Sequence, residues 1–67
     1  MPISARNQLE GIVTSIKLGG VMAEVVVAVG EHQLVSVVTR QSVEDLGLAE
    51  GDKVTAIIKS TEVMLEK

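Results

Sequence analysis

The stretch SVEDLGLAEGD, residues 42–52, decides the fold, because it predicts a helix between two groups of β-rich segments. Ser42 is a good helix N-cap, and Asp45 stands at the N3 position of a capping box. Acidic side chains in the first turn also favour the helix dipole. Gly47 suits the left-handed position that ends a helix, and Leu48 can then pack back onto the last turn. The stretch has room for one short helix.

The segments on both sides of this helix are rich in β-branched residues, in places with period-two alternation, and glycine-containing turns separate the first three. The expected strands are Leu9–Leu18, Val21–Val29 and His32–Thr39 before the helix, and Lys53–Ile58 and Thr61–Leu65 after it. Three strands, a short helix and two strands is the order of the OB-fold. The sequence therefore predicts a mainly β fold, a five-stranded OB-like barrel with one short helix between strands 3 and 4. A small Greek-key or SH3-like barrel is the alternative.

Length and composition limit the domain number and favour assembly. The 67 residues allow a single domain, residues 1–67, near the lower limit for folding alone. Without cysteine, the chain has no disulfide framework and no thiolate metal site. Apolar residues make up 46% of the chain, which is more than a small monomer can easily bury. We therefore expect a homo-oligomer.

Charge and hydropathy exclude two classes of partner. The net charge is −3 and there are no aromatic residues, whereas sequence-tolerant nucleic-acid binding needs a basic groove and stacking rings. The N-terminus lacks the pattern of a signal peptide, and no apolar run approaches the roughly 20 residues that span a bilayer. We expect a cytoplasmic protein without nucleic-acid or membrane partners.

The sequence offers little for catalysis. Its single histidine, His32, lies beside the Gly30-Glu31 turn and is expected to be a solvated turn residue. The chain shows no nucleophile–histidine–acid spacing, no paired carboxylates in an apolar setting and no glycine-rich phosphate loop. We therefore expect a binding protein, not an enzyme.

Hydrogen-bond donors gather in three places. SARNQ (residues 4–8) lies at the start, TRQS (39–42) at the head of the helix, and KST (59–61) between the last two expected strands. A tetrahedral oxyanion needs fixed donors that replace its hydration shell, and cations that offset its desolvation. Each group also has a structural reading, as a strand lead-in, a helix cap or a polar hairpin. Together they make an anion site a reasonable hypothesis.

Three motifs then connect the whole chain with one family. ISARNQLEG (residues 3–11), AEVVV (23–27) and AIIKSTEVML (56–65) resemble the molbindins, which are small molybdate-binding Mop proteins with a TOBE-like module. The resemblance implies an OB-like barrel and a cytoplasmic homohexamer built as a trimer of dimers. It also implies that molybdate or tungstate is held at subunit interfaces, for storage or buffering of the oxyanion.

The resemblance assigns residues to two kinds of anion site. The first is expected to use side chains from the three donor groups and one main-chain N–H. These residues are Ser4, Ala5 (through its amide), Arg6, Thr39, Ser42, Lys59 and Ser60. A second site near the three-fold axis is expected to use the main chain of Gly19, Gly20 and Val21, since glycine lets a ligand approach the backbone closely.

Two amides and two other functions complete the expectations. Asn7 and Gln8 are expected to pair with backbone groups and not with the ligand. The alternatives to oxyanion storage are a nucleic-acid-binding OB domain and a purely structural assembly or sensor module.

Overall fold

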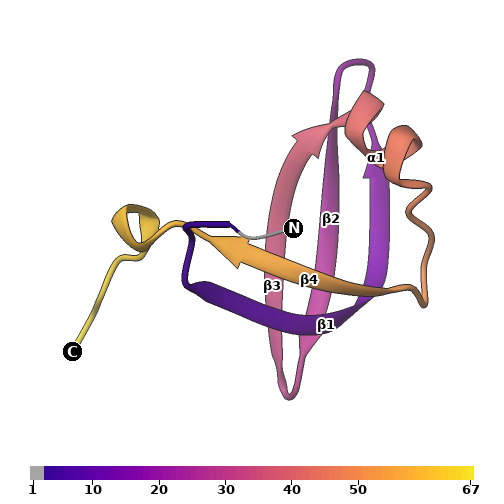
Figure 1. The fold of residues 1–67 in the computed structure, drawn as a ribbon. Coiled ribbons are helices and arrows are strands. Elements are labelled where there is room, and N and C mark those ends of the chain that lie inside the picture. The colour runs from indigo at the N-terminus through magenta and orange to yellow at the C-terminus, as the bar shows by residue number, and fades with distance from the viewer. Residues whose placement is uncertain (1–2) are drawn as a thin grey trace.

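Four antiparallel strands form one sheet in the computed structural model, which describes residues 3–67 (Figure 1). The elements are β1 (Asn7–Leu18), β2 (Met22–Val29), β3 (His32–Thr39), helix α1 (Arg40–Leu46), β4 (Lys53–Ile58) and the 3-10 helix η1 (Ser60–Glu62). The strand order in the sheet is β3-β2-β1-β4. The prediction of a mainly β fold with one helix between the third and fourth strands is confirmed.

Strand β1 bends so that it pairs with two neighbours in succession. Its first half pairs with β4 and its second half with β2, and Ile12 takes part in both ladders. A β-bulge follows Val13, and bulges increase the local bend and twist of a strand. At the bend a Cβ on Gly11 would lie 2.5 Å from Cγ1 of Val27 and 2.6 Å from the carbonyl oxygen of Ala28. This close crossing requires glycine.

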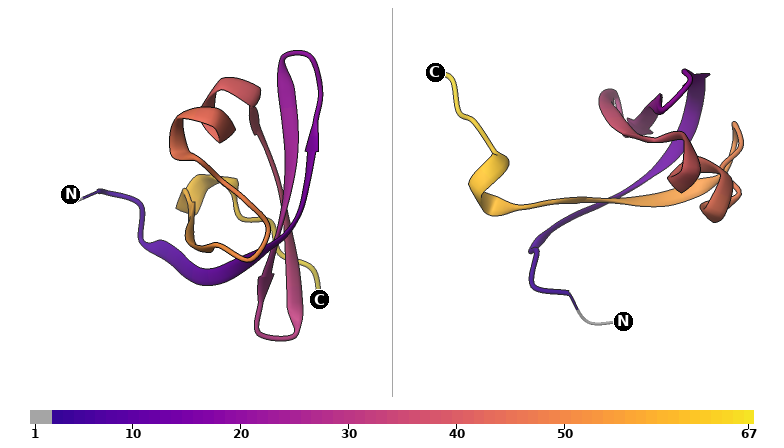
Figure 2. Two further views of the ribbon diagram at one scale, coloured as in Figure 1. Left: turned by 90° about the vertical axis from the view of Figure 1, so that its right-hand side faces the viewer. Right: turned by 90° about the horizontal axis from the view of Figure 1, so that it is seen from above.

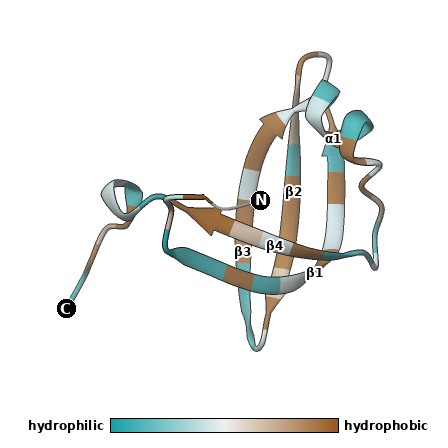
Figure 3. Ribbon diagram, viewed as in Figure 1, coloured by the Kyte–Doolittle hydropathy of each residue, from teal (hydrophilic) through white to brown (hydrophobic). Residues whose placement is uncertain are grey.

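The core is small and consists of aliphatic side chains. Period-two alternation along β2 places one face of that strand inward, and α1 covers one end of it. The buried residues are Val13, Ala23, Val25, Val27 and Val43. Figure 3 shows that apolar residues also continue beyond this core along the strands and into the C-terminal segment. The chain therefore presents a surplus of apolar surface.

The predicted fifth strand, Thr61–Leu65, is wrong in this structure. After Ile58 the chain forms η1 and then extends away from the sheet, as Figure 2 shows. Met64 is 93% exposed and Leu65 is 94% exposed. A strand needs a neighbour to satisfy its backbone hydrogen bonds, and β-rich composition alone does not supply one. The sheet of the described residues therefore stays open between β3 and β4.

The start of α1 differs from the prediction. Thr39, not Ser42, is the N-cap, and its Oγ1 accepts a hydrogen bond from the backbone N–H of Ser42 at 3.1 Å. The helix begins at Arg40, so Ser42 occupies the N3 position that had been assigned to Asp45. Thr39 and Ser42 both have hydroxyl side chains that can cap a helix. Thr39 is the N-cap because β3 ends at this residue and α1 begins at the next one, without a loop.

The C-terminal end of α1 is as predicted. Gly47 has a left-handed φ of 62°, which favours glycine. Its N–H donates to the carbonyl of Glu44 and the N–H of Leu48 to the carbonyl of Val43, both at 3.1 Å. This is a Schellman motif, and it returns the chain toward β4.

Candidate functional site

The segments SARNQ and KST meet at one end of the β1–β4 pair. Asn7 pairs with Ile58 at the last position of that ladder. Arg6 immediately precedes Asn7 and Lys59 immediately follows Ile58, so the two cationic residues both adjoin the last pair of the ladder. Figure 1 shows this end of the sheet next to η1. We refer to it below as the β1–β4 end.

Two side-chain amides fix the backbone of the β1–β4 end. Nδ2 of Asn7 donates to the carbonyl oxygen of Ile58 at 3.2 Å, in a partly buried position. Nε2 of Gln8 donates to the carbonyl oxygen of Ala5 at 3.0 Å, at the surface. The prediction that both amides pair with backbone groups is confirmed.

The cations at the β1–β4 end have no carboxylate partner among the residues that the structure describes. Within residues 3–67 the structure contains one ion pair, between Arg40 and Glu44, and it lies elsewhere. The side chains of Ser4, Arg6, Lys59 and Ser60 are exposed and take part in no hydrogen bond among these residues. Two cations and two hydroxyls thus remain available to an anion.

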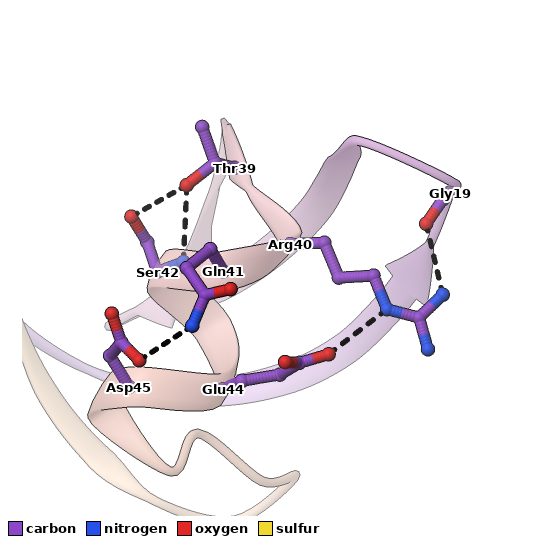
Figure 4. A network of polar contacts seen from close by, with 7 residues as sticks. All are labelled: Gly19, Thr39, Arg40, Gln41, Ser42, Glu44 and Asp45. Atoms are coloured by element: carbon purple, nitrogen blue, oxygen red, sulfur yellow. Dashed lines mark hydrogen bonds and ion pairs between the residues drawn. The ribbon is translucent and has the colours of Figure 1, made fainter.

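The third donor group lies at the opposite end of β1. Ala23 of β2 pairs with Leu18 on one side and with Val38 on the other, which places Thr39 at the same end of the sheet as the C-terminal end of β1, with β2 between them. There the hydroxyls of Thr39 and Ser42 lie 2.8 Å apart and bond to each other (Figure 4). One chain therefore does not bring Thr39 and Ser42 to the β1–β4 end.

The predicted second site adjoins this third donor group. A surface hollow is lined by Gly20, Val21, Thr39, Arg40, Gln41 and Glu44. The main chain of Arg40 donates to the carbonyl of Val21 at 2.8 Å, and its Nη1 donates to the carbonyl of Gly19 at 3.2 Å. Nε of the same side chain donates to Oε1 of Glu44 at 3.1 Å, as Figure 4 shows. Arg40 thus ties the Gly19–Val21 turn to α1.

Sequence reasoning missed this role of Arg40. The spacing of four between Arg40 and Glu44 predicts an ion pair on one helix face, and that signal was available. The bonds to Gly19 and Val21 were not predictable, because they join segments about 20 residues apart.

The concave face of the open sheet forms an apolar groove of about 330 Å³ between β3 and β4. Its walls are mainly aliphatic side chains from all four strands and from the α1 region, including Val25, Leu34, Leu48, Val54 and Ile58. A dianion would be poorly solvated there. The groove is a surface for apolar contacts and not a candidate for the anion site.

Residues 3–67 contain neither a cluster of metal-ligating side chains nor a membrane-spanning helix. No group of three or more His, Cys, Asp or Glu side chains is placed to hold a metal ion. No helix of this part of the chain is long and apolar enough to cross a membrane.

Comparison with known proteins gives the family. The TOBE domain matches residues 3–65. Molybdenum-pterin-binding protein 3 of Clostridium pasteurianum is 52% identical over 66 residues, which is 97% of each chain. The chain belongs to the molbindin, or Mop, family.

Solved structures agree with this assignment. The molybdate-binding protein of Sporomusa ovata superimposes on this molbindin with a TM-score of 0.97 and 48% identity, over 100% of both chains. The cytoplasmic molybdate-binding protein ModG, with molybdate bound, gives a TM-score of 0.85 and 41% identity, over 90% of this chain and 43% of ModG. The OB-like fold of this molbindin is therefore shared with binding proteins.

Proposed function

We propose that this molbindin binds molybdate or tungstate in the cytoplasm and stores or buffers the oxyanion without transforming it. The observation that carries the proposal is the β1–β4 end, where Arg6 and Lys59 adjoin the last pair of the ladder and have no carboxylate partner among residues 3–67. The molybdate-binding relatives, one of them described as cytoplasmic, support this choice of ligand and location.

The donor set of the β1–β4 end suits a tetrahedral dianion. Arg6 and Lys59 supply two positive charges, and Ser4, Ser60 and the amide of Ala5 supply neutral donors. An anion that exchanges its hydration shell for such donors loses little solvation energy, because charge-assisted hydrogen bonds are strong. A site with two cations and no carboxylate also favours a fully deprotonated dianion over hydrogen phosphate, since only the serine hydroxyls could accept the phosphate proton.

A second subunit is needed to complete the site. The cationic donors of one chain face solvent on one side, so an anion bound there would remain half hydrated. Thr39 and Ser42 lie at the opposite end of β1 and reach the same anion only from a neighbouring chain. We place the first anion site at a subunit interface for this reason. The hollow at Gly20 and Val21 is the corresponding candidate for the second site.

The open sheet suggests how subunits join. An OB-fold has five strands, and the apolar groove between β3 and β4 lies where a fifth strand would close the barrel. Residues 63–65 are apolar and extend away from their own sheet. The same segment of a neighbouring chain can pair with the free edge of β3 and fill the groove. Lys59 and Ser60 would then lie where the exchanged segment leaves its own subunit, in a homohexamer of three such dimers.

Two measurements test the ligand and the assembly. Native mass spectrometry of protein purified from molybdate-supplemented cells should show six chains with several bound oxyanions. Titration calorimetry of the stripped protein should give heat with molybdate and with tungstate, and sulfate should compete only at large excess. A hexamer that gives no heat with either oxyanion would be a structural assembly module. A stable monomer would contradict the interface site.

A further inference from the structure

We infer that Asn7 is a positioning residue for the oxyanion site, which holds the two cationic segments together without contacting the anion. The inference rests on the proposed function and adds to it a residue outside the donor set. Asn7 sits between the two segments: it follows Arg6 in the chain, and its side chain bonds to the residue that precedes Lys59.

The bond between Asn7 and Ile58 matters because it lies at the end of the β1–β4 ladder. The β1–β4 ladder ends at the Asn7–Ile58 pair, and beyond it both chains leave the sheet. Terminal ladder positions fray readily, because few contacts hold them. The bond from Nδ2 of Asn7 to the carbonyl of Ile58 adds one connection at that terminal pair, and it is partly buried from competing water. It thereby fixes the spacing of the Arg6 and Lys59 backbones.

The two cations also need such a connection for an electrostatic reason. Arg6 and Lys59 carry like charges on either side of the terminal ladder pair, and no carboxylate among residues 3–67 lies within ion-pair distance of either. Repulsion favours separation of the two strand ends, which would have to be reversed on binding. A bond that holds them in place before binding lowers that cost, which is the general benefit of preorganisation. Asn7 is neutral, so it provides the bond without attracting the cations away from the ligand.

The engagement of Asn7 argues against direct binding of the anion. One of the two N–H donors of its amide is already used by the carbonyl of Ile58, at 3.2 Å, and this bond fixes the direction of the side chain toward β4. The neighbouring Gln8 acts in the same way on the preceding turn, through its bond to Ala5. Both amides therefore stiffen the backbone that carries the donors.

Molybdate titration of the assembled protein tests the inference. Asn7→Leu keeps the shape of the side chain and removes its N–H donors. We expect affinity to fall about two- to tenfold, the range for loss of one neutral hydrogen bond, with unchanged stoichiometry. The matched control is Thr14→Val, which removes the 3.3 Å bond from the Thr14 hydroxyl to the carbonyl of Val26, also made by a β1 side chain. Thr14→Val should leave the molybdate affinity unchanged, even if it lowers the melting temperature as much as Asn7→Leu does.

A double-mutant cycle separates positioning from contact. In the Arg6→Ala background the site no longer has two cations to hold together, so Asn7→Leu should cost less than about twofold. An equal cost in both backgrounds would mean an independent contact with the anion and would overturn the inference. So would wild-type affinity of Asn7→Leu.

Failed assembly of Asn7→Leu and failed binding by the wild-type protein each have a defined interpretation. If Asn7→Leu does not assemble, the titration is repeated with Asn7→Ser, because a serine side chain is too short to reach Ile58. Wild-type affinity of Asn7→Ser would overturn the inference. If the wild-type protein binds neither molybdate nor tungstate, the proposed function fails and this inference with it. Binding by the wild type with no effect at Asn7 refutes the positioning role alone.

Discussion

The two ends of strand β1 carry similar donors and use them differently. At the β1–β4 end, Arg6 and Lys59 have no acidic partner in the described part of the chain. At the other end, Arg40 is bound to Glu44 and to the Gly19 carbonyl, and the hydroxyls beside it bond to each other. Arg6 and Lys59 are therefore free within one chain, whereas Arg40 is used to hold the Gly19–Val21 turn against α1. Residue type alone does not distinguish an unpaired arginine from one that is held by its neighbours.

The strongest test of this difference is removal of a free cation. Arg6→Ala should weaken molybdate binding about ten- to a hundredfold, because one charge-assisted hydrogen bond contributes roughly 1.5–3 kcal/mol. The melting temperature of the stripped protein should stay the same or rise slightly, since like charges no longer crowd an empty site. The molybdate-dependent rise in melting temperature, measured by calorimetric scanning, should be mostly lost.

Lys53→Ala is the control for this experiment. Lys53 starts β4 at its far end and pairs with Ile12, away from Arg6. It should keep the full molybdate-dependent rise. If Arg6→Ala and Lys53→Ala respond alike, SARNQ is structural and the comparison between the two ends fails.

A smaller effect is expected from the helix cap at the other end. Thr39→Ala removes the N-cap acceptor of α1 and should destabilise the folded protein by about 1 kcal/mol. Ser42→Ala leaves the cap oxygen of Thr39 in place and should cost less. Denaturant unfolding of the two variants under identical conditions measures the difference. A larger loss for Ser42→Ala would restore Ser42 as the capping residue.

The smallest effect is expected from the exposed ion pair. Glu44→Gln removes the charge that faces Arg40, and exposed pairs of this kind contribute roughly 0.2–1 kcal/mol. The unfolding free energy should therefore change little. Molybdate affinity at the β1–β4 end should be unchanged within error in the same titration. A clear gain in the number of bound oxyanions would show that Arg40, once released, serves the hollow at Gly20 and Val21.

Local signals predicted most of the fold. The bounds of β3 and β4 agree with the expected His32–Thr39 and Lys53–Ile58. Glycine-containing turns precede both strands, and Gly30 and Gly51 have the positive φ that such turns require. The end of α1 was predictable for the same reason, since Gly47 marks it. The fifth strand was not, because its existence depends on a partner edge that no local pattern reveals.

The site was predictable in part. The amide roles of Asn7 and Gln8 followed from their place at a strand start. The neighbourhood of SARNQ and KST followed from the family resemblance and not from spacing. Thr39 and Arg6 are separated within one chain because the strand registers place them at opposite ends of β1, and strand pairing is not readable from a local pattern.

The extended C-terminal segment affects how readily an assembled hexamer exchanges its subunits. If residues 63–67 cross between subunits, a chain leaves its hexamer only after its segment has been withdrawn from a neighbour's groove. Subunit exchange is then a slow event that requires partial opening of two barrels. Hexamers formed from one population of chains would keep that composition when a related molbindin is made later in the same cell. The order of synthesis, and not only the affinity between chains, would decide which mixed hexamers exist.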